Sequence, residues 1–317
     1  MRFPRAYGGQ FRTIAGVLEV TVPLDRPLDL GLTLRPLRQG RGDPSIRIAP
    51  NDVWRATATA AGAASVHLRT VGTALVATAW GPGAALALDA VPALVGEADD
   101  EAGLQPRHLV VAELVRRLRG LRMPRTGAVL QALVPTVLGQ KVTAGEAARS
   151  YAALVLALGR PAPGPAGRAG LMVPPDAARL SGVPSYGFHR WGVERRRAET
   201  IVRACRVATH LEAVAVLPRE EATTRLQAVA GVGPWTAAKV SQTALGDADA
   251  VCTGDFHLPN QVAWGLAGEA RGDDARMLEL LEPYRGHRAR VQALLVAGGV
   301  QAPRFGPRHR TRSIAGI

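Results

Sequence analysis

The chain has 317 residues, of which 47% are hydrophobic and 21% are charged, a composition typical of a globular protein. No apolar run reaches the ~18 residues that a membrane-spanning helix requires, and the first residues lack the apolar stretch of a secretory signal peptide, so we expect a cytoplasmic protein. The 39 Lys and Arg against 26 Asp and Glu give a net charge of +13 and a pI near 11.1, which favours a polyanionic partner, nucleic acid before an anionic membrane.

The first hundred residues predict an antiparallel sheet. Apolar and polar residues alternate there in short segments, Thr and Val are frequent, and Gly or Pro breaks recur at short intervals. The segment 84–96 fits either a helix or a further strand. The predicted strands are 16–24, 45–49, 53–61, 65–71 and 74–81.

Beyond these residues the apolar positions recur at i, i+3, i+4 and i+7, the period of an amphipathic helix. A Pro- and Gly-rich linker at 160–175 interrupts the pattern and is predicted to lie on the surface. Together these features predict an α+β protein with an N-terminal antiparallel sheet domain (1–104), an all-helical domain (105–300) and a basic C-terminal tail (301–317). The segments with helical period are 109–121, 128–158, 195–214 and 275–299.

Residues 226–240, LQAVAGVGPWTAAKV, place two glycines, a proline and a tryptophan between two apolar runs. Leu226, Val229 and Ala230 fit the last turn of one helix, and 235–240 fit the first turns of another. Glycine allows positive φ or the close approach of a partner, and proline suits a first helical turn. We predict a tight helix–hairpin–helix whose second helix offers free N–H groups to an anion such as phosphate, with an ordinary helical corner as the alternative.

Asp255 follows the hairpin after a turn-rich stretch, at the start of the apolar segment FHLPNQVAWGL. It can be an N-cap residue, or a carboxylate kept ionised at a helix N-terminus by cap hydrogen bonds and the helix dipole. The two interpretations are compatible, because a capping carboxylate is rigid. Cys205 and Cys252 have no CxxC spacing and could not ligate a four-thiolate iron–sulfur cluster, so we expect both to be buried and inert.

The run LQAVAGVGPWTA, followed by GDFHL, resembles the helix–hairpin–helix (HhH-GPD) DNA glycosylases, which have a Gly/Pro-rich loop and an aspartate. The segment 133–151 is similar to the family segment that contains a Gln and enters the minor groove. Among subfamilies, the chain looks most like the 3-methyladenine DNA glycosylase II type, with its N-terminal antiparallel sheet domain and no iron–sulfur cluster. The resemblance covers most of residues 10–300 and is specific over 133–151 and 226–258.

The resemblance implies base excision repair, in which a lesion nucleotide is flipped out of duplex DNA and its N-glycosidic bond is hydrolysed. Asp255 would stabilise the oxocarbenium-like sugar. At ~4 Å and an effective dielectric of ~20 this attraction is about 4 kcal/mol, roughly a thousandfold in rate. A methylated, cationic purine is already a good leaving group, so a general acid is dispensable. We therefore expect alkylated purines of the 3-methyladenine type as substrates.

Bifunctional relatives have a lysine two residues after the second glycine of the hairpin, which attacks the sugar and leads to strand cleavage. Trp235 occupies that position, which implies a monofunctional enzyme without lyase activity. Trp235 is also a candidate wall of the substrate pocket, because an aromatic face attracts a cationic base. Tyr186 and Trp191, in SYGFHRWG, are further pocket candidates, with a core cluster as the alternative. The role of His189 between them stays open.

In the resemblance, Gln140 and Lys141 match the pair that fills the gap left by the flipped base. The residue that fills this gap is usually apolar, and Lys141 departs from that pattern. Lys141 would either fill the gap with the aliphatic part of its side chain or contact a phosphate. At three pocket positions where the family often has an aromatic residue, this chain has Leu30, Lys239 and Ala293.

The resemblance implies no required cofactor. The main-chain carbonyls of Gln227, Val229 and Val232 match those that hold a monovalent cation, Na⁺ or K⁺, which bridges to a DNA phosphate. The candidate DNA-binding residues are Gln140, Lys141, Gly231, Val232, Gly233, Thr236 and Lys239.

The expected partner is double-stranded DNA with damaged bases, which implies association with the nucleoid, without a membrane or an obligate protein partner. A non-catalytic helix–hairpin–helix protein that binds DNA or recognises damage is the alternative. Asp255 discriminates between the two, since a binding protein does not need it. A bifunctional enzyme for oxidised pyrimidines or mismatches is disfavoured by the missing cysteine set and by Trp235.

Overall fold

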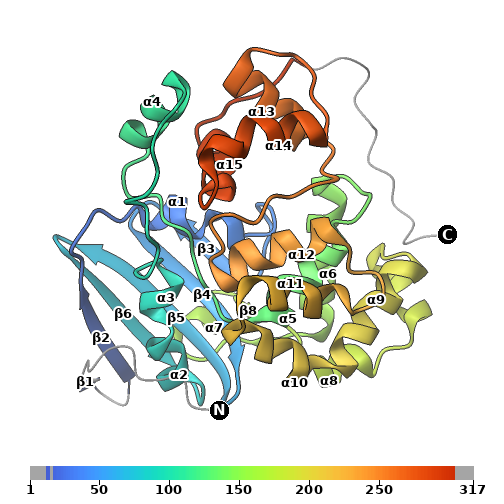
Figure 1. The fold of residues 1–317 in the computed structure, drawn as a ribbon. Coiled ribbons are helices and arrows are strands. Elements are labelled where there is room, and N and C mark those ends of the chain that lie inside the picture. Colours follow the sequence, from blue (N-terminus) through green and yellow to red (C-terminus); the bar gives the residue numbers. More distant parts are fainter. Residues whose placement is uncertain (1–11, 15–16, 304–317) are drawn as a thin grey trace.

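Figure 1 shows the computed structural model of the protein, in which residues 12–14 and 17–303 are described. Six strands form one sheet in the order β1-β2-β6-β5-β4-β3, and each neighbouring pair is antiparallel. Helices lie beside the sheet and account for most of the remaining chain. The strands are β1 (Arg12–Ile14), β2 (Val17–Pro23), β3 (Ile46–Ala49), β4 (Asp52–Thr59), β5 (Gly62–Val71) and β6 (Ala74–Trp80).

The five strands predicted from the alternation are present, with small differences at their ends, so the antiparallel sheet is confirmed. Along β6, Leu75, Ala77 and Ala79 are buried and the residues between them are not, as the two-residue period of a strand requires. β1 is a sixth strand that the alternation does not predict.

Helices α1 (Leu30–Leu34), α2 (Ala84–Asp89) and α3 (Val91–Leu94) pack with the sheet in one hydrophobic core. The segment 84–96, which fitted a helix or a strand, is therefore helical. The buried residues explain this outcome, because they follow the helical spacing i, i+3, i+4 and i+7: Ala84, Ala87, Leu88 and Val91.

The Pro/Gly-rich linker 160–175 lies on the surface at residues 160, 161 and 168–170, as expected, but other residues of it pack on the sheet. It forms the short strands β7 (Arg160–Pro161) and β8 (Met172–Val173) and the turn α7 (Pro165–Arg168). Small apolar side chains of the linker reach the sheet because glycines let the backbone approach closely; a Cβ at position 164 would collide with the ring of Trp80. The buried residues at this contact are Ala56, Ala162, Ala166, Leu171 and Val173.

The predicted helical segment 128–158 is divided into α5 (Val129–Leu138) and α6 (Ala144–Leu158). Lys141 lies between them with φ +55°, a left-handed conformation that ends a right-handed helix. Thr143 then begins α6 with a capping box. The apolar period continues across this break, so the sequence pattern does not show where α5 ends and α6 begins.

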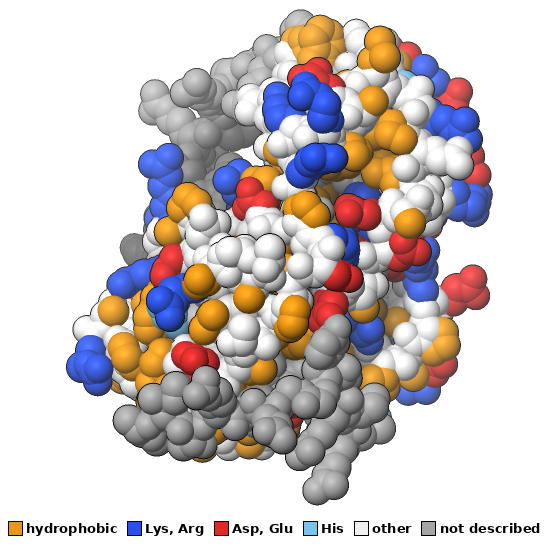
Figure 2. All heavy atoms as spheres, turned by 90° about the vertical axis from the view of Figure 1, so that its left-hand side faces the viewer, with side chains coloured by type: hydrophobic (Ala, Val, Ile, Leu, Met, Phe, Trp, Pro, Cys, Tyr) orange, Lys and Arg blue, Asp and Glu red, His pale blue; other side chains and the backbone are white. Residues whose placement is uncertain are grey.

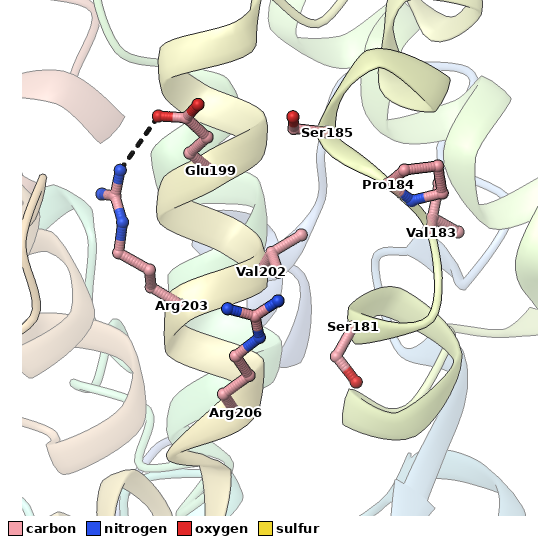
Figure 3. Close-up of a pocket in the computed structure, with 8 residues that line it drawn as sticks. All are labelled: Ser181, Val183, Pro184, Ser185, Glu199, Val202, Arg203 and Arg206. Carbon is pink, nitrogen blue, oxygen red and sulfur yellow. Dashed lines mark hydrogen bonds and ion pairs between the residues drawn. The ribbon is translucent and has the colours of Figure 1, made fainter.

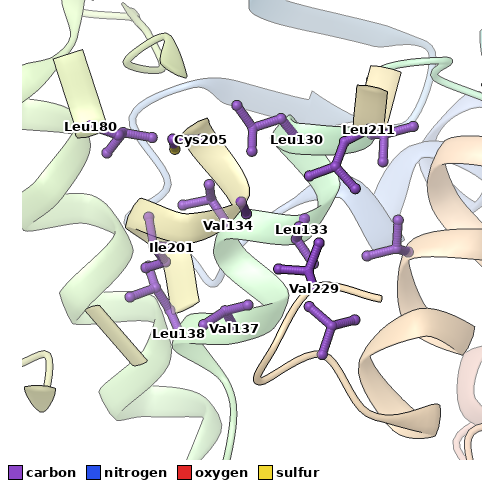
Figure 4. Packing of buried hydrophobic residues seen from close by; sticks show 14 of the residues in the cluster. Leu130, Leu133, Val134, Val137, Leu138, Leu180, Ile201, Cys205, Leu211 and Val229 are labelled. Atoms are coloured by element: carbon purple, nitrogen blue, oxygen red, sulfur yellow. The ribbon is translucent and has the colours of Figure 1, made fainter. Parts of the chain in front are cut away.

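Helix α5 is central to the larger helical cluster, which comprises the buried apolar side chains of 129–155 and 180–244 (Figure 4). Leu133 and Val137 of α5 are fully buried in it. The carboxylate of Glu212 accepts hydrogen bonds from the first two backbone N–H groups of α5, both at 2.9 Å. The later helices of this cluster are α8 (Ala177–Ser181), α9 (Arg195–Arg206), α10 (Ala208–Glu212), α11 (Arg219–Gln227) and α12 (Pro234–Val240).

The smaller helical cluster combines one early helix with the last three. Helix α4 is separated in sequence from the other members, yet it contacts α13 and α15 through Val111 and Leu114, which are buried. Figure 1 shows α13, α14 and α15 together at the top of the molecule, above the sheet and the larger cluster. The helices are α4 (Leu109–Arg117), α13 (Leu258–Ala267), α14 (Asp274–Leu281) and α15 (Arg288–Ala297).

Buried ion pairs hold α15 in place. Arg290 binds Asp99 through both terminal nitrogens, and their side chains are 2% and 4% exposed. Asp249 accepts hydrogen bonds from Arg288 Nε at 2.8 Å and Nη2 at 2.6 Å, and it also pairs with Arg219 at the start of α11 at 3.0 Å. Burial alone would raise the pKa of Asp249, but the hydrogen bonds and charge of Arg288 outweigh it and lower the pKa.

Figure 2 shows the face at the left of Figure 1, where Lys and Arg side chains form a group in the upper part. Helix α4 lies in this part and ends in exposed Arg116 and Arg117, followed by exposed Arg119. Among residues 12–14 and 17–303, no helix is long and apolar enough to cross a membrane. The predicted basic tail lies outside the described residues from position 304 onward, and the domain boundary near residue 104 stays a prediction.

Candidate functional site

The hairpin, residues 228–233, joins α11 to α12. Helix α11 ends at Gln227, so Val229 and Ala230 lie in the connection and not in the last helical turn that the sequence indicated. Val229 and Val232 are buried in the larger cluster, and Val232 N donates to Val229 O at 2.9 Å. These two side chains fix the loop to the core and leave its backbone facing outward.

The two glycines of the hairpin differ in backbone conformation and in what surrounds them. Gly231 has φ +99°, and a Cβ there would collide with the side chain of Thr200. The fold itself therefore requires a glycine at position 231, and contact of its backbone with DNA stays a prediction. Gly233 has φ −94°, and apart from its two chain neighbours no described residue has an atom within 4 Å of the position of its missing Cβ. Nothing in the described fold demands a glycine at 233, so its role in binding stays a prediction.

Asp255 is held by three hydrogen bonds. Its Oδ2 accepts from Trp235 Nε1 at 2.9 Å, and its Oδ1 accepts from His257 N at 2.9 Å and Leu258 N at 3.0 Å. The carboxylate thus caps the start of α13, as expected from the sequence, although it lies two residues before His257, the N-cap position. The bond from Trp235 is a tertiary contact that the sequence does not reveal.

The surroundings of Asp255 keep it ionised. Burial alone would raise its pKa, but the hydrogen bond from Trp235, the backbone N–H groups and the charge of Lys239 outweigh burial and lower the pKa below its ordinary value. A half-buried carboxylate that stays anionic is suited to stabilise a positive charge brought next to it.

A second carboxylate supports the loop that carries Asp255. Asp274, the first residue of α14, accepts a hydrogen bond from Gly254 N at 2.7 Å through Oδ2. Gly254 has φ +80°, so this bond fixes a left-handed residue directly before Asp255. The sequence analysis missed Asp274, and only its place after an N-cap aspartate, which predicts a helix start, marks it in the sequence.

Gln140 joins the turn after α5 to the hairpin. Its Nε2 donates to Gly231 O at 2.9 Å and to Thr236 Oγ1 at 2.8 Å. The next residue, Lys141, is exposed and has the positive φ described above. Buried Arg197 supports this turn, because its Nη1 donates to Leu138 O at 2.7 Å.

Helix α12 connects the hairpin to Asp255. Its residues Ala237 and Val240 are buried in the larger cluster, whereas Trp235 packs against the smaller one. Lys239 lies one helical turn after Trp235, on the same side of α12. The structure thus gathers Gln140, the hairpin, Trp235, Lys239 and Asp255 where the two helical clusters meet.

The other two pocket candidates differ in burial. Trp191 is 7% exposed and packs edge-on against Phe188 in the larger cluster, with ring centroids 5.5 Å apart, which is the core role that the sequence left open. Tyr186 is 80% exposed. Within residues 12–14 and 17–303, no hydrogen bond joins either residue to Asp255 or to the hairpin.

A pocket of about 210 Å³ lies between α9 and the segment after α8 (Figure 3). Arg203 forms part of its wall, pairs with Glu199 at 3.0 Å and donates from Nη1 to Ala230 O in the hairpin at 2.8 Å. The pocket therefore adjoins the hairpin but does not contain Asp255. Its lining residues are Ser181, Val183, Pro184, Ser185, Glu199, Val202, Arg203 and Arg206.

Both cysteines are buried, as expected. Burial raises the pKa of Cys205 to about 12 and that of Cys252 to about 11, so both remain protonated thiols at neutral pH. No group of three or more His, Cys, Asp or Glu side chains in the described part of the chain could hold a metal ion. The monovalent cation at the carbonyls of Gln227, Val229 and Val232 stays a prediction; such oxygens are suitable ligands for a hard cation.

No family model matches the chain, and no curated protein matches it in sequence. Solved structures do match its fold. A 3-methyladenine DNA glycosylase from Archaeoglobus fulgidus has a TM-score of 0.69 at 19% identity, over 87% of this chain and 97% of its own. An 8-oxoguanine glycosylase/lyase from Clostridium acetobutylicum, in complex with double-stranded DNA, has a TM-score of 0.69 at 13% identity, over 92% of this chain and 97% of its own.

A third structure, MBOgg1 in complex with a low-affinity DNA ligand, has a TM-score of 0.70 at 16% identity, over 92% of this chain and 98% of its own. The chain therefore shares the fold of these DNA glycosylase structures along most of its length. Because the similar structures include both a 3-methyladenine enzyme and an 8-oxoguanine glycosylase/lyase, the fold does not select a substrate or a mechanism.

Proposed function

We propose that the chain is a monofunctional DNA glycosylase that hydrolyses the N-glycosidic bond of alkylated purines flipped out of duplex DNA. The observation that carries the proposal is the setting of Asp255. This carboxylate is half-buried, has a lowered pKa, is fixed by three hydrogen bonds and lies beside a hairpin suited to bind phosphate. A protein that only binds DNA has no need for such a group.

The proposed reaction requires little more than this carboxylate. The bond between C1′ and the purine nitrogen breaks, and its electron pair leaves with the base. The positive charge that develops on the sugar is stabilised by Asp255, and water then adds to C1′ and releases its proton to solvent. With the sugar at ~4 Å and an effective dielectric of ~20, this attraction is worth about 4 kcal/mol.

DNA binding is proposed to use the backbone at Gly233 and the first N–H groups of α12 for phosphate, with Gln140 and Lys141 in the gap left by the flipped base. Gln140 is already held by Gly231 O and Thr236, so it is pre-oriented. The net charge of +13 supports binding that weakens steeply with salt.

The monofunctional assignment rests on Trp235. At the position where bifunctional relatives have their nucleophilic lysine, this chain has an indole that donates a hydrogen bond to Asp255. We also propose the domain limits 1–104 and 105–300, a Na⁺ or K⁺ ion at the hairpin carbonyls, and action at the nucleoid without an obligate protein partner.

A panel of duplex oligonucleotides, each with one lesion, tests the function. The purified protein should release the base from one or more alkylated purines and leave an abasic strand that breaks only after alkali or heat. Tight binding without release of any base would favour the binding-only alternative. Excision of oxidised bases alone would overturn the substrate class and retain the enzyme class.

Borohydride tests the monofunctional assignment. No covalent protein–DNA complex should be trapped, because neither of the two lysines, Lys141 and Lys239, occupies the nucleophile position. The N-terminal amine is a rival nucleophile, so a trapped complex must be mapped to its residue. A complex that disappears with Lys239→Met would show that the nucleophile has moved by one helical turn.

A further inference from the structure

The pocket in Figure 3 does not contain Asp255, and Arg203 joins it to the hairpin. Arg203 lies on the α9 wall of the pocket and donates from Nη1 to Ala230 O at 2.8 Å. The cavity volume of about 210 Å³ is below the roughly 300–1,000 Å³ of pockets that enclose a drug-sized molecule. The pocket therefore suits a small chemical group that binds beside the hairpin.

The one carboxylate among the residues that line this pocket is already neutralised. Glu199 pairs with Arg203 at 3.0 Å and with Arg195, which lies outside the pocket, at 2.7 Å. The hydrogen bond from Arg195 lowers the pKa of Glu199, so this residue stays ionised at neutral pH. Two arginines against one glutamate leave an excess positive charge at this wall.

Arg206 adds a further positive charge to the pocket. In the described part of the chain it makes no hydrogen bond or ion pair. Arg203, by contrast, uses its two terminal nitrogens for Ala230 O and Glu199. Arg206 is exposed, and Figure 3 shows its guanidinium group in the space between α9 and residues 181–185. Its N–H donors are therefore available to a group that enters the pocket.

The opposite wall supplies hydroxyl groups and an apolar surface. Ser181 and Ser185 lie on the segment that faces α9, and Ser185 Oγ makes no hydrogen bond with the residues that the structure describes. Val183 and Pro184 lie on the same segment, and Val202 faces them from α9. A guanidinium group binds phosphate oxygens in a bidentate manner, and a short apolar surface suits the sugar attached to that phosphate.

We propose that this pocket binds a backbone phosphate of the DNA duplex, with Arg206 as the hydrogen-bond donor and the apolar wall against the adjoining deoxyribose. This inference rests on the proposed function, because duplex DNA is the proposed partner. It extends the DNA contact beyond the candidate residues at the hairpin and at Gln140.

The position of the pocket favours DNA as the source of the phosphate. Each DNA strand has a phosphate about every 3.4 Å along the helix axis, so a strand bound at the hairpin brings further phosphates close to it. The pocket adjoins the hairpin through the bond from Arg203 to Ala230 O. The net charge of +13 also favours a polyanion over a single free anion.

The first test measures affinity for a duplex with a stable abasic-site analogue at several salt concentrations, so that no base needs to be excised. Arg206→Met should bind about tenfold more weakly, the usual loss for a hydrogen bond to a charged group. The slope of log K against log salt concentration should become smaller by about 0.9, because one fewer phosphate is neutralised. Arg206→Lys keeps the charge, so it should keep the wild-type slope.

Arg69→Met is the matched control. Arg69 is also exposed and lies on β5 of the sheet, and it likewise makes no hydrogen bond or ion pair within the described residues. Its substitution should change neither the affinity nor the salt slope. Thermal unfolding of each variant shows whether the protein is folded.

A series of duplexes, each with one phosphate replaced by an uncharged methylphosphonate, locates the contact. At one position the replacement should weaken binding of the wild type about as much as Arg206→Met does, and it should not weaken the variant further. Replacement of the other contacted phosphates should weaken both proteins equally.

The outcomes are distinct. Unchanged affinity and salt slope in Arg206→Met would overturn the inference and leave the glycosylase function intact, as would a loss of affinity that no methylphosphonate position reproduces. Binding of deoxyadenosine monophosphate that requires Arg206 and is not displaced by duplex would show that the pocket takes a free nucleotide, which also overturns the inference. Wild-type protein that binds no duplex would overturn both the inference and the proposed function.

Discussion

The two helical clusters are stabilised in different ways. The larger cluster is an apolar core around α5, with Leu133 and Val137 fully buried. The smaller cluster has fewer buried apolar residues, and the position of α15 depends on the ion pairs of Asp99 and Asp249. Apolar packing is insensitive to pH and to charge substitutions, whereas buried ion pairs are sensitive to both. The two helical clusters on either side of the candidate site should therefore unfold under different conditions.

The candidate site lies where these two clusters meet. Helix α12 buries Val240 in the larger cluster and packs Trp235 against the smaller one, and Asp255 binds Trp235 on one side and the start of α13 on the other. The geometry of Asp255 thus depends on both clusters remaining together, even though each is held by different forces.

The largest effect is expected from the residue that both clusters position. Asp255→Asn should lower base excision by about a hundredfold or more, because one charge that stabilises the transition state is lost. Duplex affinity should remain nearly unchanged. Single-turnover excision and a binding titration measure the two quantities.

Asp273→Asn is the matched control for this substitution, because Asp273 is an exposed N-cap of α14 and Asn caps a helix equally well. If Asp255→Asn excised bases as fast as the wild type, the catalytic assignment would be wrong and the binding-only alternative would be favoured.

Asp249→Ala should lower the free energy of unfolding by about 3 kcal/mol, because it leaves Arg288 without its buried carboxylate. Urea denaturation measures this loss. Glu221→Ala removes an exposed i, i+4 partner of Arg225 and should cost less than about 0.5 kcal/mol. An equal decrease in the free energy of unfolding in the two variants would show that buried ion pairs do not stabilise the smaller cluster more than an exposed pair does.

Acid should act on the two clusters with opposite signs. The lowered pKa of Asp249 means that its stabilising contribution is complete above the ordinary Asp pKa of ~3.9 and is lost as the pH falls through the pKa in the folded protein. Burial raises the pKa of Glu212, so ionised Glu212 disfavours the fold, and this cost is relieved as the pH falls. Below about pH 4, the backbone amides of α15 should therefore lose protection from hydrogen exchange before those of α5. Simultaneous loss of both helices would contradict this prediction.

The two hairpin glycines give the smallest expected effects. Gly231→Ala should destabilise the protein by about 1–3 kcal/mol, because it forces a left-handed alanine against Thr200. Gly233→Ala should leave stability within about 0.5 kcal/mol. It should weaken duplex affinity severalfold, by the loss of about one hydrogen bond to phosphate. Unchanged affinity in Gly233→Ala would remove Gly233 from the proposed DNA contact.

Local patterns predicted much of the fold. Alternation predicted five strands, the helical period located most helical segments, and the hairpin was identified from its glycines and proline. The break at Lys141 was missed because the apolar period of α5 and α6 continues across it. The linker 160–175 was expected on the surface because Pro and Gly usually indicate loops, yet its small apolar residues pack on the sheet.

The candidate site could be predicted only in part. Asp255 and the hairpin are conspicuous in the sequence, but the contact from Trp235 to Asp255 and that from Gln140 to Gly231 depend on tertiary packing. Asp274 was missed for the same reason. Burial separates Trp191 from the site, although its aromatic character suggested a pocket residue.

The composition of the smaller cluster also affects how the chain folds during synthesis. Helix α4 emerges from the ribosome long before α13 and α15, whose side chains cover Val111 and Leu114. At translation rates of ~10 residues per second, its apolar face waits on the order of ten seconds for its partners. All buried residues of the larger cluster lie between Val129 and Ala244, so this cluster can form during this interval. Premature termination before α13 would therefore leave a folded larger cluster beside an unpaired, aggregation-prone α4.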